Sequence, residues 1–248
     1  MTLKDSLQSI GLHHAANALE ELVATALREQ PDLAGMLERL TAVEQRGRRA
    51  SSFKRRMDRS RVGHVRTAED FDWQHPRHID RALVEQALTL RFVDEGGAVL
   101  FFGPPGSGKT HLARALCMAS LLAGQRAHFV TQRALCDNLA AQDTAAALER
   151  RLRHYTRVHL LCIDEVAYPQ CDLRRLDLLY ELVRRRYEAR RAIITTAALP
   201  FSEWATVFPS TAATAALIDR LVHRALIVHI DADSYRRKEA AERAAARR

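Results

Sequence analysis

The sequence contains no long apolar stretch, and this bears on where the protein acts. No apolar run approaches the roughly 20 residues that an α-helix needs to cross a bilayer. The first residues, Met1 to Asp5, are not followed by the apolar core of a secretory signal. We therefore expect a cytoplasmic protein without a membrane partner.

Cysteine is scarce, with four residues in a chain of 248. No two cysteines form a Cys-X-X-Cys pair, and two of them lie in apolar runs. Closely spaced cysteine pairs are typical of zinc sites and of disulfide frameworks. We expect reduced structural thiols, not metal ligands, at Cys117, Cys136, Cys162 and Cys171.

Acidic residues are outnumbered by basic ones. There are 30 Asp and Glu against 38 Lys and Arg, which gives a net charge of +8 and a pI of about 9.8. This excess favours a polyanionic partner, with nucleic acid the first candidate and a membrane surface a distant second. A chain of 248 residues, 47% of them hydrophobic, can hold one α/β core and a small accessory domain.

The most informative stretch is a P-loop of eight residues. Residues 98–102 before it predict a buried strand, and residues 111–123 after it predict a helix. The glycines let successive N–H groups point at a polyphosphate, and the helix N-terminus adds partial positive charge. Lys109 can reach the β- and γ-phosphates, and the Thr110 hydroxyl can bind Mg²⁺. The predicted nucleotide-binding residues are Gly103, Pro104, Pro105, Gly106, Ser107, Gly108, Lys109 and Thr110.

A second apolar run ends in two carboxylates, Asp164 and Glu165. Residues 158–163 predict a buried parallel strand, which places both carboxylates at its C-terminal end. Asp164 is suited to hold Mg²⁺, directly or through water, and Glu165 to polarise a water that attacks the γ-phosphate. This acidic pair favours ATP hydrolysis over transfer to a small acceptor, because P-loop kinases often lack the second carboxylate.

Alternating patterns predict an α/β core around the P-loop. The nucleotide then lies at the carboxyl ends of the strands. An amphipathic helix at 79–90 precedes the core, and the last 18 residues allow one short helix. Strands are expected at 98–102, 126–131, 158–163, 191–196 and 225–230, and helices at 109–123, 131–140, 144–154, 173–188 and 214–224.

The first part of the chain is predicted to be helical. Apolar residues recur at three- and four-residue steps from Leu7 to Leu27 and from Leu33 to Val43, with a break around Pro31. The pattern predicts a small hairpin of two helices. We expect a helical N-terminal domain at 1–66 and the ATPase domain at 67–248.

The segment from Arg46 to Arg66 carries nine basic residues and one acid, Asp58. Charge of one sign does not support a helix by internal pairing, so we interpret it as a surface that neutralises the phosphates of DNA or RNA. The alternative is a solvated linker helix. The candidate DNA-binding residues are Arg46, Arg48, Arg49, Lys54, Arg55, Arg56 and Arg59.

Three further features concern the nucleotide site. Residues 67–73 predict an extended or turn segment whose Phe71 and Trp73 dock on the core, although Trp73 could stack on a base instead. Thr196 ends a predicted strand, where P-loop ATPases of the AAA+ type place a polar residue that contacts the γ-phosphate or the attacking water. Arg220 lies on a predicted helix and is suited to reach the γ-phosphate of a neighbouring subunit, or else it pairs with an acid such as Asp219.

Five short strings stand in a characteristic order and spacing. They are Gly-Pro-Pro-Gly-Ser-Gly-Lys-Thr-His-Leu-Ala (103–113), Ile-Asp-Glu (163–165), Leu-Pro-Phe-Ser-Glu-Trp (199–204), Asp-Arg-Leu (219–221) and Ser-Tyr-Arg (234–236). Together they resemble the IstB-like ATPases, which are ATP-dependent helpers of bacterial insertion sequences and relatives of the DnaC helicase loaders. The resemblance covers nearly the whole chain, and the third and the last strings are more specific than the P-loop.

The resemblance implies an α/β fold of the AAA+ P-loop NTPase type, with a central parallel sheet flanked by helices, a small all-helical N-terminal domain and a minimal C-terminal lid. It implies ATP and Mg²⁺ as cofactors, bound by the P-loop and the acidic pair. Arg220 resembles the arginine that acts on a neighbouring subunit, and Arg236 resembles the arginine that senses the γ-phosphate in its own subunit. The family assembles as homo-oligomers on duplex DNA with ATP bound and presents target DNA to a partner transposase.

Two positions depart from the family pattern. Relatives usually carry an asparagine before the Leu-Pro-Phe-Ser-Glu-Trp string, where this chain has Ala198. Hydrolysis is then expected to be slow, unless Thr196 takes over part of that role. The segment 168–172 also differs, and we attach no function to it. The competing hypotheses are a replicative helicase loader of the DnaC type and a P-loop kinase of a small metabolite.

Overall fold

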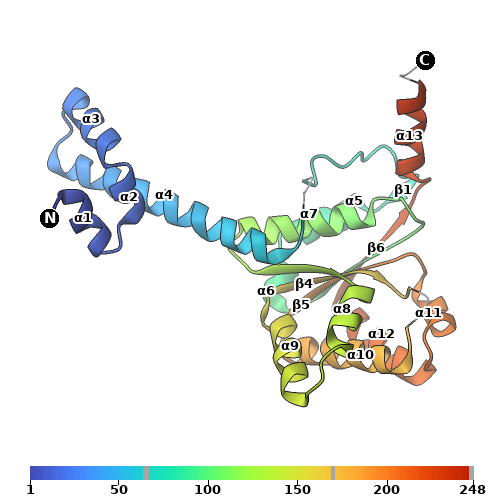
Figure 1. The fold of residues 1–248 in the computed structure, drawn as a ribbon. Coiled ribbons are helices and arrows are strands. Elements are labelled where there is room, and N and C mark those ends of the chain that lie inside the picture. The colour runs from blue at the N-terminus through green and yellow to red at the C-terminus, as the bar shows by residue number, and fades with distance from the viewer. Residues whose placement is uncertain (64–66, 169–170, 246–248) are drawn as a thin grey trace. The chain divides into compact units, whose positions relative to one another are not determined.

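The computed structural model describes residues 1–63, 67–168 and 171–245 (Figure 1). The chain divides into two units, Met1–Asp58 and Arg59–Arg248, and each is described here by itself. The domain limits expected from the sequence, 1–66 and 67–248, stay a prediction.

In the described part of the chain, the second unit is built on a six-stranded sheet with the order β1-β6-β2-β5-β4-β3. The five strands from β2 to β6 run parallel, and β1 pairs antiparallel with β6. The predicted parallel sheet is confirmed. Each expected strand begins and ends within one residue of its expected limits, except β4. The strands are β1 (His78–Ile79), β2 (Ala98–Phe102), β3 (Ala127–Thr131), β4 (Leu160–Val166), β5 (Ala192–Ala197) and β6 (Ala225–Asp231).

Helices cover both faces of this sheet, which explains why β2, β3, β4 and β5 are almost entirely buried (Figure 1). On one face lie α5 (Arg81–Leu88) and α7 (Lys109–Leu122). On the other face Leu161 and Ile163 of β4 join a core cluster with α8 and α10, whereas Cys162 between them faces Cys117 of α7. That second face is covered by α8 (Gln132–Ala140), α9 (Ala145–Arg157), α10 (Leu173–Glu188) and α12 (Thr211–Val222).

Two short helices among the described residues of the second unit were not expected from the sequence. The helix predicted at 79–90 is present as α5, but it is shorter at both ends: Ile79 belongs to β1, and α5 ends at Leu88 before a separate helix, α6 (Arg91–Glu95). Leu90 between them adopts a left-handed conformation with φ of 61°, which ends the first helix. The Leu-Pro-Phe-Ser-Glu-Trp string forms α11 (Phe201–Val207), whose Trp204 is fully buried. The expected C-terminal helix is α13 (Tyr235–Ala245).

The first unit contains more helices than the predicted hairpin of two. Its described residues form α1 (Leu3–Ser9), α2 (His13–Asn17), α3 (Leu19–Glu29) and α4 (Leu33–Ser60). The hairpin prediction is wrong because the first apolar stretch is interrupted. Gly11 turns the chain with φ of 83°, and the buried Glu44 of α4 accepts the N–H groups of His14 and Ala15 at 2.8 and 2.9 Å. These bonds start α2 as a separate helix.

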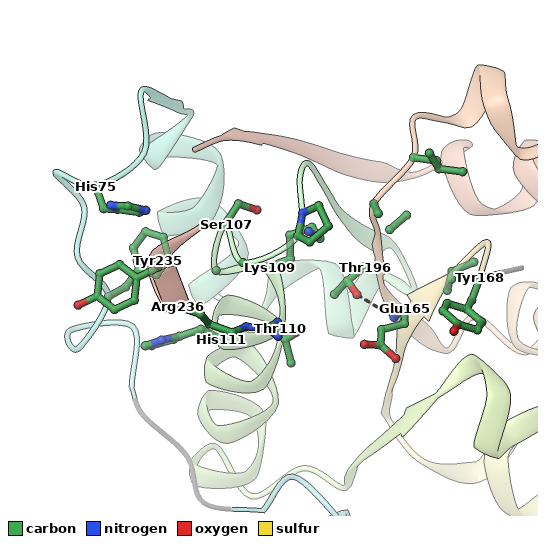
Figure 2. A pocket seen from close by; sticks show the side chains of 18 of the residues that line it. His75, Ser107, Lys109, Thr110, His111, Glu165, Tyr168, Thr196, Tyr235 and Arg236 are labelled. Atoms are coloured by element: carbon green, nitrogen blue, oxygen red, sulfur yellow. Dashed lines mark hydrogen bonds between the residues drawn. The ribbon is translucent and has the colours of Figure 1, made fainter. Parts of the chain in front are cut away.

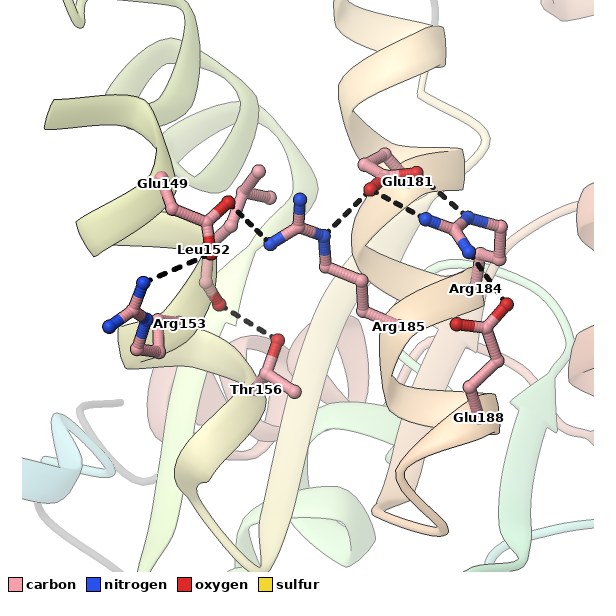
Figure 3. Close-up of polar contacts among 8 residues, drawn as sticks. All are labelled: Glu149, Leu152, Arg153, Thr156, Glu181, Arg184, Arg185 and Glu188. Atoms are coloured by element: carbon pink, nitrogen blue, oxygen red, sulfur yellow. Dashed lines mark hydrogen bonds and ion pairs between the residues drawn. The ribbon is translucent and has the colours of Figure 1, made fainter. Parts of the chain in front are cut away.

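Ion pairs join α9 to α10 on the surface of the second unit (Figure 3). Arg185 donates to Glu149 of α9 and to Glu181 of its own helix, each at 2.7 Å. Arg184 connects Glu181 to Glu188 at 2.9 and 2.6 Å. These side chains are partly exposed to water, so each pair contributes about 1 kcal/mol or less to stability.

The next residue, Arg186, is different because it is completely buried. Its guanidinium donates to carbonyl oxygens of Tyr155, Val158, His159 and Ala192. Burial lowers the pKa of Arg186 to about 9. This side chain ties the C-terminal end of α9 to the first residues of β4 and β5, and thereby holds the two strands that carry much of the site described below.

We predict that Arg186→Met lowers the free energy of unfolding by about 3 kcal/mol, because several buried carbonyl groups lose their donor. Arg184→Met serves as the matched control on the same helix and should cost no more than about 1 kcal/mol. Urea denaturation followed by circular dichroism measures both. Equal losses for the two variants would show that Arg186 contributes no more than a surface ion pair.

Candidate nucleotide-binding site

The P-loop connects β2 to α7 at the carboxyl end of the sheet (Figure 2). Gly106 and Gly108 have φ of 83° and 97°, in the region that favours glycine. A Cβ at Gly106 would lie 2.3 Å from Ser234 Oγ, and one at Gly108 would lie 2.5 Å from Phe71 Cε2. Two segments far apart in sequence therefore pack directly on the loop. The predicted docking of Phe71 is seen here. Trp73 is half-buried between Phe71 and Arg81 of α5, whose Cζ lies 4.9 Å from the centroid of the Trp73 ring.

Lys109 is held inside the P-loop. Its Nζ donates to the carbonyl oxygens of Gly103 and Pro104, both at 2.7 Å. The pKa of Lys109 is lowered to about 8, mainly by burial and in part by the positive charge of Arg236, while the charges of Asp164 and Glu165 oppose the change. A polyphosphate would supply the negative charge that this buried ammonium group needs.

The carboxylate of Asp164 is buried and receives two hydroxyl groups. Thr110 Oγ1 donates to it at 3.0 and 3.2 Å, and Thr196 Oγ1 donates to Oδ1 at 2.5 Å. The same Thr196 oxygen accepts the N–H of Glu165 at 2.9 Å (Figure 2). The hydroxyl of Thr196 is therefore occupied by the acidic pair and is not directed at a substrate.

Thr110 and Asp164 offer the kind of oxygen ligands that Mg²⁺ prefers. Across residues 1–63, 67–168 and 171–245, no group of three or more His, Cys, Asp or Glu could hold a metal. A cation at Thr110 and Asp164 would thus take its remaining ligands from phosphate and water, as is usual for Mg²⁺ in nucleotide sites. The residues present fit that use. The hydroxyl of Ser107 in the P-loop is buried without a hydrogen-bond partner, which also leaves a polar group for a ligand.

The acidic pair lies in an irregular part of β4. The pairing of β4 with β5 shifts register between Ile163 and Val166, and Glu165 and Ala167 adopt left-handed conformations with φ of 57° and 61°. A bulge of this kind redirects a side chain and is common beside active sites. It also explains why β4 ends later than expected, since the sequence pattern stopped at the carboxylates.

These residues surround one cavity of about 570 Å³, a size that suits a nucleotide. Its walls are the P-loop, residues 165–168 and residues 196–199. Its other end is aromatic, with Phe71, His75 and Tyr235, and the rings of His75 and Tyr235 are 4.9 Å apart. Neither His75 nor Tyr235 was expected at the site. Tyr235 directly precedes Arg236 in the Ser-Tyr-Arg string, which could have indicated it, whereas no pattern in the sequence indicates His75.

Arg236 is brought into this cavity by the first turn of α13. The N–H of Tyr235 donates to the carbonyl oxygen of Gly106 at 3.0 Å. Lys238 pairs with Asp72 at 3.1 Å, which joins α13 to the segment that carries Phe71. The structure thus places Arg236 beside the P-loop, where the family resemblance expects it.

Arg220 lies outside the cavity. Its Nη1 donates to the carbonyl oxygen of Ala216 at 2.9 Å, and its guanidinium lies over the ring of Tyr180 at 5.0 Å. Together with Gly97, the residue before β2, it lines a small cavity at the opposite end of that strand from the P-loop. A role for Arg220 in its own subunit has no geometric support, and its role in a neighbouring subunit stays a prediction.

The candidate DNA-binding residues lie on α4, and the structure distinguishes among them. Arg48 donates to Glu44 at 2.6 Å and to the carbonyl oxygen of Gly11 at 2.7 Å, so it has a structural use. Arg56 is half-buried and donates to Ser52 at 2.6 Å. The side chains of the others are exposed; these are Arg46, Arg49, Lys54, Arg55 and Arg59. Arg66, at the end of the basic segment, lies outside the described residues. So do residues 169–170, which belong to the segment 168–172 that differs from the family pattern.

Two general expectations concern the rest of the chain. All four cysteines are buried and free. Within the described ranges, no helix is both long enough and apolar enough to cross a membrane.

Comparison with solved structures is informative about the fold. The chain is similar to the crystal structure of the DnaC helicase loader, with a TM-score of 0.51 and 19% identity, over 72% of this chain and 99% of that one. At this identity the likeness shows the fold alone, which is that of AAA+ P-loop ATPases.

Comparison of sequences is informative about the family. The chain is 32% identical to the ATP-binding protein of insertion sequence IS5376 from Geobacillus stearothermophilus, over 81% of this chain and 80% of that protein. It is 31% identical to the ATP-binding protein of insertion sequence IS21 from Pseudomonas aeruginosa, over 94% and 88%. Residues 5–243 match the sequence model of the family described as IstB-like ATP binding protein. This chain therefore belongs to the IstB-like ATP-binding protein family.

Proposed function

We propose that this protein is a DNA-binding AAA+ ATPase of an insertion sequence, which assembles on target DNA with ATP and recruits or activates a partner transposase in the cytoplasm. The observation that carries the proposal is the cavity in which Lys109, Thr110, Glu165 and Arg236 meet. Family membership supports it, because the similar proteins named above are ATP-binding proteins of insertion sequences.

The arrangement accounts for hydrolysis of ATP as follows. Lys109 and Arg236 bring positive charge to the phosphates, and Thr110 and Asp164 would hold Mg²⁺. Bound Mg²⁺ supplies neutralisation of the charge that develops on the phosphate oxygens. Glu165 is exposed to the cavity and can accept a proton from the attacking water.

Hydrolysis is proposed to be slow. Ala198 lines the cavity where relatives usually have an asparagine, and it offers no side-chain hydrogen bond to the water. Thr196 does not replace that asparagine, because its hydroxyl bonds to Asp164 and to the Glu165 N–H. A slow ATPase still serves as a timer for an assembly that binds DNA in its ATP form.

The remaining surfaces support the proposed partners. The exposed basic side chains of α4 suit contacts to DNA phosphates. The first unit also exposes apolar side chains of the kind that protein partners cover, namely Leu3, Ile10, Leu27, Leu33 and Leu37. Arg220, which has no role in its own cavity, is proposed to complete the site of a neighbouring subunit in a homo-oligomer.

A helicase loader is the alternative, favoured by the likeness of the fold to the DnaC helicase loader. The two hypotheses differ in the partner that the first unit binds. A gene for an integrase-type transposase next to the gene of this protein supports the first, and a replication gene supports the second. A small-metabolite kinase would instead yield a phosphorylated small molecule as product.

We predict that Glu165→Gln retains ATP binding, loses at least about 100-fold in turnover and stays assembled on duplex DNA. Lys109→Ala should lose ATP binding and with it the assembly, since the phosphates lose their buried cation. Gel-shift and sizing with ATP, with ADP and without nucleotide measure the assembly, and phosphate release measures turnover. Assembly on DNA that does not respond to ATP would refute the proposed function.

Nucleotide affinity should depend on pH through Lys109. Its pKa is lowered to about 8 in the free protein, and bound phosphates favour its charged form. The affinity for nucleotide is therefore highest below that pKa. It falls by about tenfold for each pH unit as the pH rises above it. Calorimetric titration with ADP, without Mg²⁺, measures the profile. Lys109→Arg is the control, because a guanidinium stays charged and its profile should be flat; a flat profile for the unchanged protein would contradict the assignment.

The role of α4 can be tested with matched changes of charge. Changing Lys54 and Arg55 to Gln should weaken duplex binding for all sequences and reduce the slope of log K against log salt by about 2. Changing Lys4 and Arg28 to Gln alters the net charge equally within the same unit and should leave the slope unchanged. An equal change of the slope for the two pairs of substitutions would favour the alternative, in which the basic segment is a solvated linker helix.

A further inference from the structure

We propose that Gln132 is a positioning residue for Glu165, although Gln132 does not border the cavity that holds the proposed nucleotide site. The proposal rests on the proposed role of Glu165 in hydrolysis. It adds a residue whose side chain fixes the backbone on which that carboxylate stands.

Gln132 is the first residue of α8, directly after β3, and its side chain is buried. Its Oε1 accepts the N–H of Ala167 at 2.8 Å. On the other side of the bulge, Thr196 of β5 accepts the N–H of Glu165 at 2.9 Å. The two N–H groups on either side of Val166 are thus held by side chains from two different elements.

The turn needs such restraint. Glu165 and Ala167 both have left-handed conformations, with φ of 57° and 61°, and neither is glycine. Such conformations persist only where surrounding contacts enforce them, and they cluster at functional sites. Without an acceptor at Gln132, the Ala167 N–H is left buried and unbonded, which favours a change of the turn. In a regular strand successive side chains alternate between faces, so the carboxylate of Glu165 would be directed elsewhere.

The expected consequence is specific to the chemical step. A general base must lie within hydrogen-bond reach of its water, and an error of about 1 Å in placement can cost about 100-fold in rate. Phosphate binding depends on other groups, mainly Lys109 and the P-loop. Gln132 instead borders a separate cavity of about 290 Å³ with Cys136 and Arg175. Its loss should therefore lower kcat and leave nucleotide affinity nearly unchanged.

The test compares three substitutions in the full-length protein. Gln132→Met keeps the length of the side chain but has no strong acceptor, and Gln132→Asn keeps the amide but is too short to reach Ala167. Gln132→Glu keeps an oxygen at the bonding position, and Arg133 and Arg175 border the same small cavity. We expect kcat to fall about tenfold for Met and for Asn, with KM for ATP and Kd for ADP within about twofold of the unchanged protein. Gln132→Glu should keep kcat within about threefold.

Several results would overturn the proposal. They are a normal kcat for Gln132→Met and Gln132→Asn, an equal loss in all three variants, or a loss of ADP affinity that matches the loss of kcat. Thermal unfolding is measured in parallel. Should the Met variant fail to fold, the comparison of Asn with Glu decides the matter, because both retain polar side chains.

A double-mutant cycle separates this proposal from the proposed function. In Glu165→Gln, where no carboxylate remains to be placed, adding Gln132→Met should not lower turnover further. Normal turnover by Glu165→Gln would refute the role of Glu165 itself. Loss of turnover in Glu165→Gln, together with normal turnover in Gln132→Met and Gln132→Asn, would refute only the role of Gln132.

Discussion

The hydrogen bonds to the carboxylate of Asp164 are the interaction on which the site depends. Thr110 reaches it from the first turn of α7, and Thr196 reaches it from β5. One buried carboxylate on β4 is therefore bonded both to the helix that follows the P-loop and to β5, the strand between β4 and β2. Because a buried charge is costly without such partners, the three residues stabilise one another only in this arrangement. It is also the arrangement that leaves two oxygens ready for a divalent cation.

In the rest of the site, positive charge is only partly neutralised by the protein. Lys109 is buried with a lowered pKa and bonds to the carbonyl groups of its own loop, so it is a cation without a full counter-charge. Arg236 adds a second positive charge to the same cavity. Such a cavity favours a polyanion for electrostatic reasons alone. The aromatic end of the cavity, where the segment before the core and the first turn of α13 meet, is the part that would contact a base.

The position of Arg220 and the identity of Ala198 bear on how the proposed hydrolysis would be controlled. On the proposed function, Ala198 offers no side-chain hydrogen bond to an attacking water and Arg220 lies at the far end of the sheet, so the catalytic site would need a further group. Completion by a neighbouring subunit would link hydrolysis to assembly. The turn held by Gln132 and Thr196 is proposed to position the carboxylate of Glu165, so that it is already in place when the neighbouring subunit binds.

Sequence alone determined the five parallel strands, the P-loop and the acidic pair, because buried parallel strands are rich in apolar residues and the phosphate loop needs a fixed local spacing. It did not indicate β1, the short strand that pairs antiparallel with β6. Tertiary structure decided what depends on distant contacts. Glu44 separates α2 from α1 by bonds to residues 29 and 30 positions away. Gln132 holds Ala167 across 35 positions, and His75 meets Tyr235 only after the sheet has formed. No local pattern encodes such pairs, since each residue also fits an ordinary helix or loop.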